Sequence, residues 1–355
     1  MKRTTALFLS LLAAAFVCFP ATAQEKPWMK YLNPSAYFQA GYSFETDFNE
    51  RIDNTFYIKR ARLAMQGELY KSAYFGRLEY EVEAELANSP KLLDCWLKYS
   101  IVPEFGIQFG QFRTPLSLET SECHPLNLEM IDYSLLVRRF VRRSDEDVTG
   151  ISAMGREIGL QFYGDVFKLG RSFSLFRYHV GIFNGNGINR GDNNRKKDWI
   201  GNVQVQPISG LRIALFGWKG TLTSEGVSVG RNRWALGACY EKQGWTARAE
   251  YIHHSGHKTT DYNATTQTWS GIARADGWYA MLGVPVTKWF QPFVRYDAYR
   301  EGAKWSGLKN VFSVCPNFRL HKNLLFQLQY NHIFDKLNAA DRHCNEFWAQ
   351  AYIRF

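Results

Sequence analysis

Charged side chains occupy every second position of one short stretch, "FGRLEYEVEAEL". The charged positions are Arg77, Glu79, Glu81, Glu83 and Glu85. A period of two places alternate side chains on opposite faces of a β-strand. Carboxylates in a row on one face need water or cations beside them. The stretch therefore predicts a strand with one solvated or ion-paired face and one apolar face.

A second charged stretch, "VRRFVRRSDED", contains Arg138, Arg139, Arg142 and Arg143. Arginine stays charged and binds oxyanions through paired hydrogen bonds, so the cluster predicts an anion-selecting constriction. An alternative is that the acids that follow neutralise the arginines. The surrounding segment 114–154 has more acidic than basic residues.

No other constellation predicts catalysis, a metal ion or a cofactor. Four histidines (His253, His254, His257 and His332) lack a Ser or Asp partner at an informative spacing. The cysteines are widely spaced without a CxxC pair, which argues against zinc and a disulfide framework. A bond between Cys123 and Cys344 stays open.

The N-terminus predicts export. Lys2 and Arg3 precede an apolar run, and small residues before Gln24 suit a cleavage site, so residues 1–23 read as a signal peptide. No later run is long and apolar enough for a membrane helix. Aromatic residues make up 16% of the chain and no repeat is visible, so residues 24–355 read as one ordered domain.

Alternating segments continue along the chain and predict sixteen strands. They lie near 35–44, 55–69, 73–86, 91–100, 105–113, 155–164, 172–183, 198–207, 210–219, 232–242, 244–254, 276–286, 289–299, 308–318, 322–332 and 345–355. Short links such as "PISG" and "EKQG" alternate with longer ones at 45–54, 114–154, 184–197, 220–231, 255–275 and 333–344. This asymmetry is typical of an outer-membrane β-barrel with short periplasmic turns.

Aromatic residues near the strand ends are expected to form girdles at the membrane surfaces. They are Tyr99, Trp199, Trp218, Trp234, Trp245, Trp278 and Trp289. The chain ends "EFWAQAYIRF", which predicts a closing strand with Phe347 and Phe355 toward lipid. Terminal Phe355 also suits a membrane-assembly signal.

A sixteen-stranded barrel is too wide for side chains to fill, so the long third loop, 114–154, is expected to fold into an aqueous lumen. Alternate positions along each strand face the lumen, and these positions predict a lumen wall with nearly equal numbers of basic and acidic side chains. The basic set is Arg60, Arg62, Arg77, Lys98, Arg177, Arg212, Arg248 and Arg295. The acidic set is Glu68, Glu79, Glu81, Glu83, Glu85, Asp94, Glu157, Glu250 and Asp297. A turn near Lys71 would pair Arg62 with Glu81 and Arg60 with Glu83.

The net charge of +10 is carried partly by later loops. The basic residues there are Arg190, Arg195, Lys196, Lys197, Lys219, Arg231, Arg233, Arg300, Lys304 and Lys309. They are expected to focus anions at the mouth or to contact anionic lipopolysaccharide. A nucleic-acid partner does not suit an exported barrel.

Four stretches resemble the phosphate-selective porin O and P family: "FYIKRARLAMQGEL", "DCWLKYSIVPEFGIQFGQFRTPLSLE", "GREIGLQFYGD" and "YHVGIFNGNGIN". The resemblance is densest over residues 55–190. It implies a trimeric, sixteen-stranded porin in the outer membrane of a Gram-negative bacterium, with the third loop folded inward. "VRRFVRR" falls where that family carries arginines in its constriction loop. The family's lysine cluster for phosphate has no counterpart that we can match here.

The sequence thus predicts a porin for passive diffusion of small hydrophilic solutes, with a possible anion or phosphate preference. Three alternatives stay open: a barrel enzyme of lipase or protease type, a secreted glycan-binding β-protein, and gated uptake with a lipoprotein partner. A plug-like N-terminal domain, which energised uptake needs, is not evident.

Overall fold

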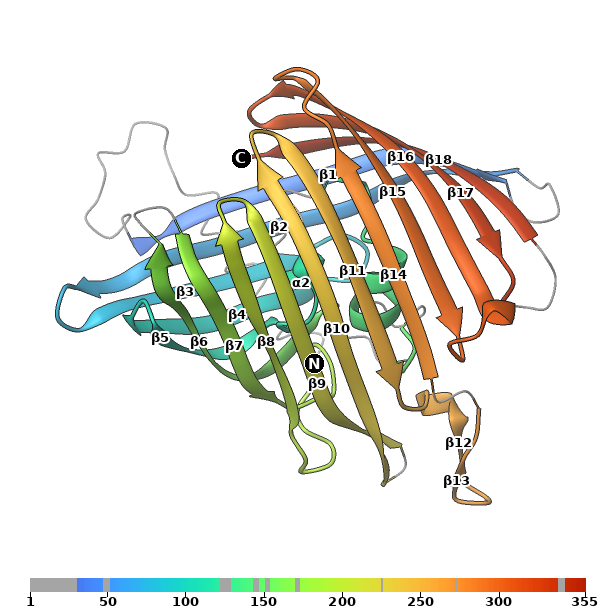
Figure 1. Cartoon of the computed structure of the whole chain (residues 1–355), viewed down its shortest axis with the longest axis horizontal. Coiled ribbons are helices and arrows are strands. Elements are labelled where there is room, and N and C mark those ends of the chain that lie inside the picture. Colours follow the sequence, from blue (N-terminus) through green and yellow to red (C-terminus); the bar gives the residue numbers. More distant parts are fainter. Residues whose placement is uncertain are drawn as a thin grey trace.

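Sixteen antiparallel strands close into one barrel in which spatial neighbours follow the order of the chain (Figure 1). The computed structural model describes residues 31–46, 52–121, 129–142, 147–150, 154–169, 173–224, 226–271, 274–337 and 342–355. The expected signal peptide lies outside these ranges. Within them, no helix combines the length and apolarity needed to cross a membrane.

The barrel strands are β1 (Asn33–Thr46), β2 (Ile52–Ser72), β3 (Gly76–Glu85), β4 (Lys91–Val102), β5 (Phe105–Arg113), β6 (Arg156–Leu169), β7 (Phe173–Phe183), β8 (Asp198–Ile208), β9 (Leu211–Ser224), β10 (Val227–Lys242), β11 (Trp245–Ser255), β14 (Arg274–Gly283), β15 (Phe290–Glu301), β16 (Leu308–His321), β17 (Leu324–Asp335) and β18 (Arg342–Arg354). Several of them, such as β2, β9 and β10, extend further than the sequence pattern indicates, whereas β3 is shorter. The remaining elements are α2 (Leu118–Ser121), α3 (Leu135–Val137), the π-helix η3 (Arg138–Arg142), the 3-10 helices η4 (Thr259–Asp261) and η5 (Trp305–Gly307), and the hairpin β12 (Tyr262–Asn263) and β13 (Thr268–Trp269).

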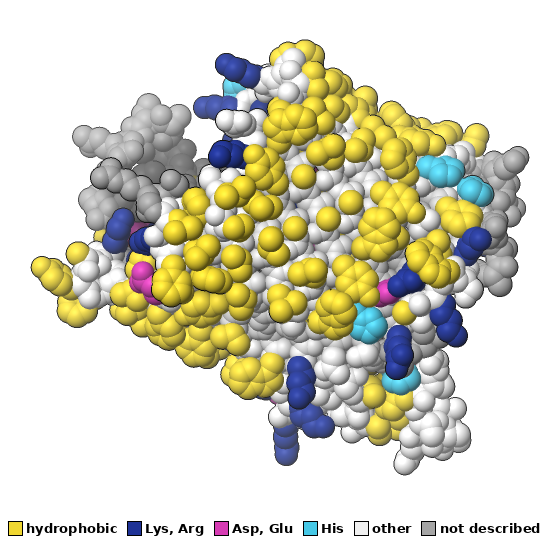
Figure 2. Space-filling model, viewed as in Figure 1, with side chains coloured by type: hydrophobic (Ala, Val, Ile, Leu, Met, Phe, Trp, Pro, Cys, Tyr) yellow, Lys and Arg dark blue, Asp and Glu magenta, His cyan; other side chains and the backbone are white. Residues whose placement is uncertain are grey.

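Alternation sorts the side chains of each strand between the two sides of the wall. In β10, Arg233 and Ala235 are buried, whereas Trp234 and Leu236 are about half exposed on the other side. Figure 2 shows hydrophobic side chains spread over the outer wall, with lysines and arginines gathered toward its ends. This distribution suits a barrel that meets lipid outside and polar groups inside.

All sixteen predicted strands are confirmed, and the closed barrel overturns the alternative of a soluble sandwich. Two expectations were wrong. The link predicted at 220–231 is mostly strand, because β9 continues to Ser224 and β10 begins at Val227. Trp218 is buried inside the wall rather than in an outer girdle. The small β12–β13 hairpin was not predicted.

Closure depends on the pairing of the first and last strands. β1 and β18 are antiparallel, and Phe355 N–H donates to the carbonyl of Ala36 at 2.8 Å. Phe355 is exposed, as expected for a lipid-facing end. In hydrocarbon an open edge would leave backbone groups unpaired, at several kcal/mol each.

Gly41 lies in this seam and leaves no room for a side chain. A Cβ there would sit 2.2 Å from the Ala349 carbonyl oxygen, whereas one at Gly217 meets nothing within 4 Å. We expect Gly41→Val to destabilise the barrel by about 1–3 kcal/mol or more. Thermal unfolding followed by circular dichroism in detergent checks this, with Gly217→Val as the matched control. Equal unfolding temperatures for the two variants would contradict the account.

Candidate functional site: the lumen and the segment between β5 and β6

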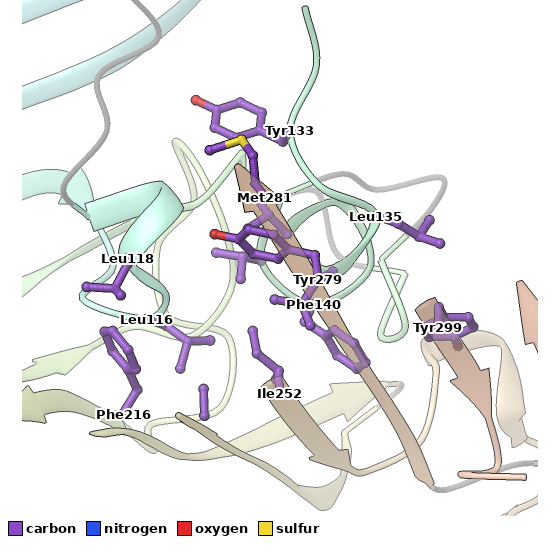
Figure 3. Packing of buried hydrophobic residues seen from close by; sticks show 14 of the residues in the cluster. Leu116, Leu118, Tyr133, Leu135, Phe140, Phe216, Ile252, Tyr279, Met281 and Tyr299 are labelled. Atoms are coloured by element: carbon purple, nitrogen blue, oxygen red, sulfur yellow. The ribbon is translucent and has the colours of Figure 1, made fainter. Parts of the chain in front are cut away.

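The segment between β5 and β6 packs its apolar side chains against one side of the barrel. Leu116, Leu118, Leu136 and Phe140 are fully buried, in one cluster with residues of β8–β11 and β14–β17. Figure 3 shows Leu116 and Leu118 next to Phe216, and Phe140 among side chains of the strands. Burial of this size holds the segment against the wall by the hydrophobic effect.

Glu250, on β11, binds the start of α2. Its carboxylate accepts hydrogen bonds from the backbone N–H groups of Leu118 (2.7 Å) and Glu119 (3.0 Å). The hydroxyls of Ser117 (3.1 Å) and Tyr279 (2.6 Å) donate to the same carboxylate. One buried acid thereby satisfies N–H groups that a helix start leaves unpaired.

A second contact comes from β15. Arg295 Nε donates to Asp297 Oδ2 at 2.7 Å, and its other nitrogens donate to the carbonyls of Asp132 and Tyr133. Asp297 in turn accepts from the N–H of Leu135 at 2.9 Å. This ion pair therefore meets both donors and acceptors of the segment, which limits the cost of burying its charges.

Further anchors come from other strands on the same side. Gln329 accepts from the N–H of Ile131 at 2.7 Å, and Asn317 donates to the carbonyl of Glu129 at 2.9 Å. Arg233 donates to the carbonyl of Phe140. Polar side chains from β8 to β17 thus satisfy backbone groups along the segment.

Glu119 links the two helical parts of the segment. Its carboxyl accepts from the N–H of Ser134 at 3.1 Å and lies 3.8 Å from Arg295. Burial raises the pKa of Glu119 to about 7, although Arg295, the Ser134 hydrogen bond and Arg248 lower it and Glu250 adds to the rise. A raised pKa means that protonation favours the packed state.

The stabilising effect of protonated Glu119 is complete below its ordinary pKa of about 4.5 and is lost as the pH rises through about 7. The shift corresponds to roughly 3 kcal/mol. We expect hydrogen-exchange protection factors over residues 129–135 to be lower at pH 8 than at pH 5. In Glu119→Gln this difference should shrink, and an unchanged pH dependence would refute the assignment.

The opposite side of the barrel faces an open cavity of about 860 Å³. Its charged lining comprises five basic and three acidic side chains, from β2 to β7 and the start of the segment. They are Lys71, Arg77, Lys98, Arg113, Arg177, Glu81, Asp94 and Asp165. The cavity is therefore more basic than the balanced lumen that strand parity predicts.

Lys98 lies within this cavity, with its Nζ 4.5 Å from the centre of the Tyr163 ring. Among the described residues, no carboxylate lies within 4.0 Å of Lys98. Arg177 and Arg77, by contrast, pair with Asp165 (2.8 Å) and Glu79 (2.9 Å). Its direct partner in the β3–β4 register is Glu79, which pairs with Arg77.

The row of glutamates is largely neutralised. Arg156, fully buried, donates to Asp94 and lies 3.0 Å from Glu83. Arg62 Nε lies 2.7 Å from Glu85. These buried acids contribute little negative field to the open cavity, because each has a cationic neighbour.

The predicted hairpin register was wrong. Arg62 is opposite Glu85 rather than Glu81, since the turn lies at residues 73–75 and the pairing shifts between Glu68 and Tyr70. Arg60 donates to Gln39 at 2.6 Å instead of pairing with Glu83. Arg62 still forms cross-strand ion pairs, with different partners.

Four other predicted arginines contact residues of the barrel wall or of the segment. Arg248 lies 2.9 Å from Glu129 of the segment, and Arg212 lies 3.1 Å from Glu241. Arg138 is 4.0 Å from Asp132, and the Arg139 guanidinium lies 4.8 Å from the centre of the Tyr299 ring. The side chain of Arg142 and all of Arg143 lie outside the described residues.

Several site residues escaped prediction. Lys59 is the extra residue where β1 and β2 shift register, and it pairs with Asp132 at 3.5 Å. Arg156 is the first residue of β6, and its side chain is buried inside the barrel although the alternation along the strand predicts that it faces outward. Arg231 and Arg233, expected in a loop at the mouth, are buried in β10, next to Asp198 and Asp147 respectively. Cys344 is a buried free thiol, and Cys123, its suggested disulfide partner, lies outside the described residues.

Residues 34–204 match the sequence profile of a family described as phosphate-selective porin O and P. The resemblance seen in the sequence is therefore confirmed over that part of the chain. No curated protein matches the sequence.

Solved porins share the fold. An anion-selective porin from Comamonas acidovorans has a TM-score of 0.70 at 12% identity, over 91% of this chain and 99% of that one. Pseudomonas putida OprB reaches 0.64 at 8% identity, over 92% and 95%. Salmonella typhi OmpF reaches 0.63 at 11% identity, over 91% and 97%. At sequence identities this low, the similarity shows a shared fold and nothing further.

Proposed function

We propose that this chain is a porin, a barrel for passive diffusion, and that its lumen favours small anions. Residues 34–204 match the phosphate-selective porin O and P family. The basic excess of the cavity lining carries this proposal. Arg113 lies at the loop end of β5, Lys98 lies further along, and Arg77 follows the turn after β2. An anion crossing the cavity thus meets successive positive charges.

Segment 114–154 is proposed to narrow the lumen from one side. The support is its hydrogen bonding to Glu250, Arg295 and Gln329, which are buried residues on the inner side of three strands. Water and solutes then pass on the other side, through the cavity beside β3–β7. Arg138, Arg139, Arg142 and Arg143 are proposed as additional charges at this constriction.

The contribution of Lys98 is testable in planar bilayers. One charge in contact with another in water is worth about 1 kcal/mol, so Lys98→Gln should lower the chloride-to-potassium permeability ratio by up to roughly fivefold. The reversal potential in a KCl gradient measures this ratio, and adding inorganic phosphate tests for a reduced chloride current.

Exposed Lys219 of β9 provides the matched control, as Lys219→Gln. A fourfold variant measures how much the segment contributes to anion selectivity. In it, Ala replaces Arg138, Arg139, Arg142 and Arg143. Unchanged selectivity in the Lys98 variant would refute the proposal that the cavity selects anions. Unchanged selectivity in the fourfold variant would refute the proposed role of the four arginines.

Loosening the segment should widen the channel. Glu250→Ala leaves the N–H groups of Leu118 and Glu119 without their buried acceptor, which costs about 1–3 kcal/mol for each unpaired group. We expect larger or noisier single-channel conductance, with Glu104→Ala in the exposed turn between β4 and β5 as the control. Identical conductance with intact folding would argue that the segment does not limit the pore.

Three further assignments belong to the same proposal. The barrel forms a homotrimer in the outer membrane, since porins with this fold include one solved as a trimer. Residues 1–23 direct its export. Exposed loop residues Arg190 and Arg195 contact lipopolysaccharide, as their charge suits phosphate groups.

The family match and the porin neighbours favour a non-enzymatic channel, and an assay for lipid or peptide hydrolysis tests the enzyme alternative.

A further inference from the structure

Two histidines form a close pair on the outer side of the last hairpin. His332 on β17 and His343 on β18 have their rings 5.4 Å apart, and His343 Nδ1 lies 3.3 Å from His332 Nε2. Both alternate with inward-facing residues, since Ile333 and Cys344 beside them are buried. His343 is exposed, so an external ligand can reach the pair.

The distance between the two nitrogens suits one metal ion. Zn²⁺ binds imidazole nitrogen at roughly 2.0–2.1 Å in tetrahedral geometry, which sets two such ligands about 3.4 Å apart. The pair, at 3.3 Å, already has this separation. In the structure the two nitrogens share a hydrogen bond, which the ion would replace when His343 carries its proton on Nε2 instead of Nδ1.

A neighbouring side chain fixes the ring of His332. Its Nδ1 lies 2.9 Å from Asn345 Oδ1, which also accepts from the hydroxyl of Tyr330 at 2.7 Å. Because an amide oxygen only accepts, this orientation of Asn345 favours the tautomer of His332 with its proton on Nδ1 and a lone pair on Nε2. Such a hydrogen bond to the second ring nitrogen is the usual support of a metal-binding histidine.

The pair also occupies a position that metal ions can reach from water. Tyr330 and Phe347 are direct partners in the β17–β18 register, and His343 lies further toward the loop, opposite Phe334. Tyr330 and Phe347 are exposed on the outer wall, at a level that suits the aromatic girdle of a barrel. The histidines therefore lie between the Tyr330–Phe347 pair and the loop end of the hairpin.

We propose that His332 and His343 form a surface site for a divalent transition-metal ion of the zinc class. The bound ion links β17 to β18, the strand that closes the barrel on β1. Water or an anionic headgroup completes its coordination. This site is independent of the lumen and of the solute that the channel carries.

Isothermal titration of the full barrel in detergent, free of any histidine tag, with ZnCl₂ tests the proposal. We expect one zinc ion per chain, and loss of that binding in His332→Gln and in His343→Gln. Asn345→Leu should weaken binding by roughly tenfold or more, because it removes the support of His332. His253→Gln, a histidine on the outer side of β11 beside Trp234, is the matched control and should bind as wild type.

Cu²⁺ electron paramagnetic resonance gives a second readout on the wild-type chain alone. Hyperfine coupling to two imidazole nitrogens is expected, and coupling to fewer would overturn the site even if a variant failed to fold. Zinc binding that persists in both histidine variants would also overturn it. Loss of binding in His253→Gln would place the metal elsewhere. Bilayer conductance tests the porin separately, so the two proposals can fail independently.

Discussion

Backbone hydrogen bonding in hydrocarbon is the constraint on which the rest of this structure depends. No water is available there, so the strands must pair with one another on both sides and the sheet must close. The seam between β1 and β18 meets this need, with a glycine where a larger residue would strike the neighbouring backbone. Closure with this many strands creates an interior that side chains on the wall cannot fill.

The described parts of the segment between β5 and β6 pack against strands of the barrel. Buried acids such as Glu250 and Asp297 accept hydrogen bonds from its backbone N–H groups. An apolar cluster beneath adds the main attraction, and the hydrogen bonds fix the position. Specific placement thus comes from a few charged side chains on the strands rather than from helical propensity, since the helices are very short.

Strand positions could be predicted because alternation with a period of two directly reports which side chains meet lipid. The lumen was less accessible to prediction, because parity holds only while pairing is regular. A bulge turned Lys59 inward, a later turn and a register shift moved the partner of Arg62, and Arg156 reached inward from the end of its strand. Which charges stay open to water depends on where the long segment lies, and contacts such as Arg233 with Phe140 carry no local sequence signal.

The two sides of the lumen come from different parts of the chain. Every residue that lines the open cavity falls between Lys71 and His179, whereas the strands that hold the helices of the segment follow later. The cavity lining and the strands that hold the segment therefore come from separate, contiguous stretches of the chain. A substitution in the first stretch can change the charge of the cavity without touching the strands that support the segment.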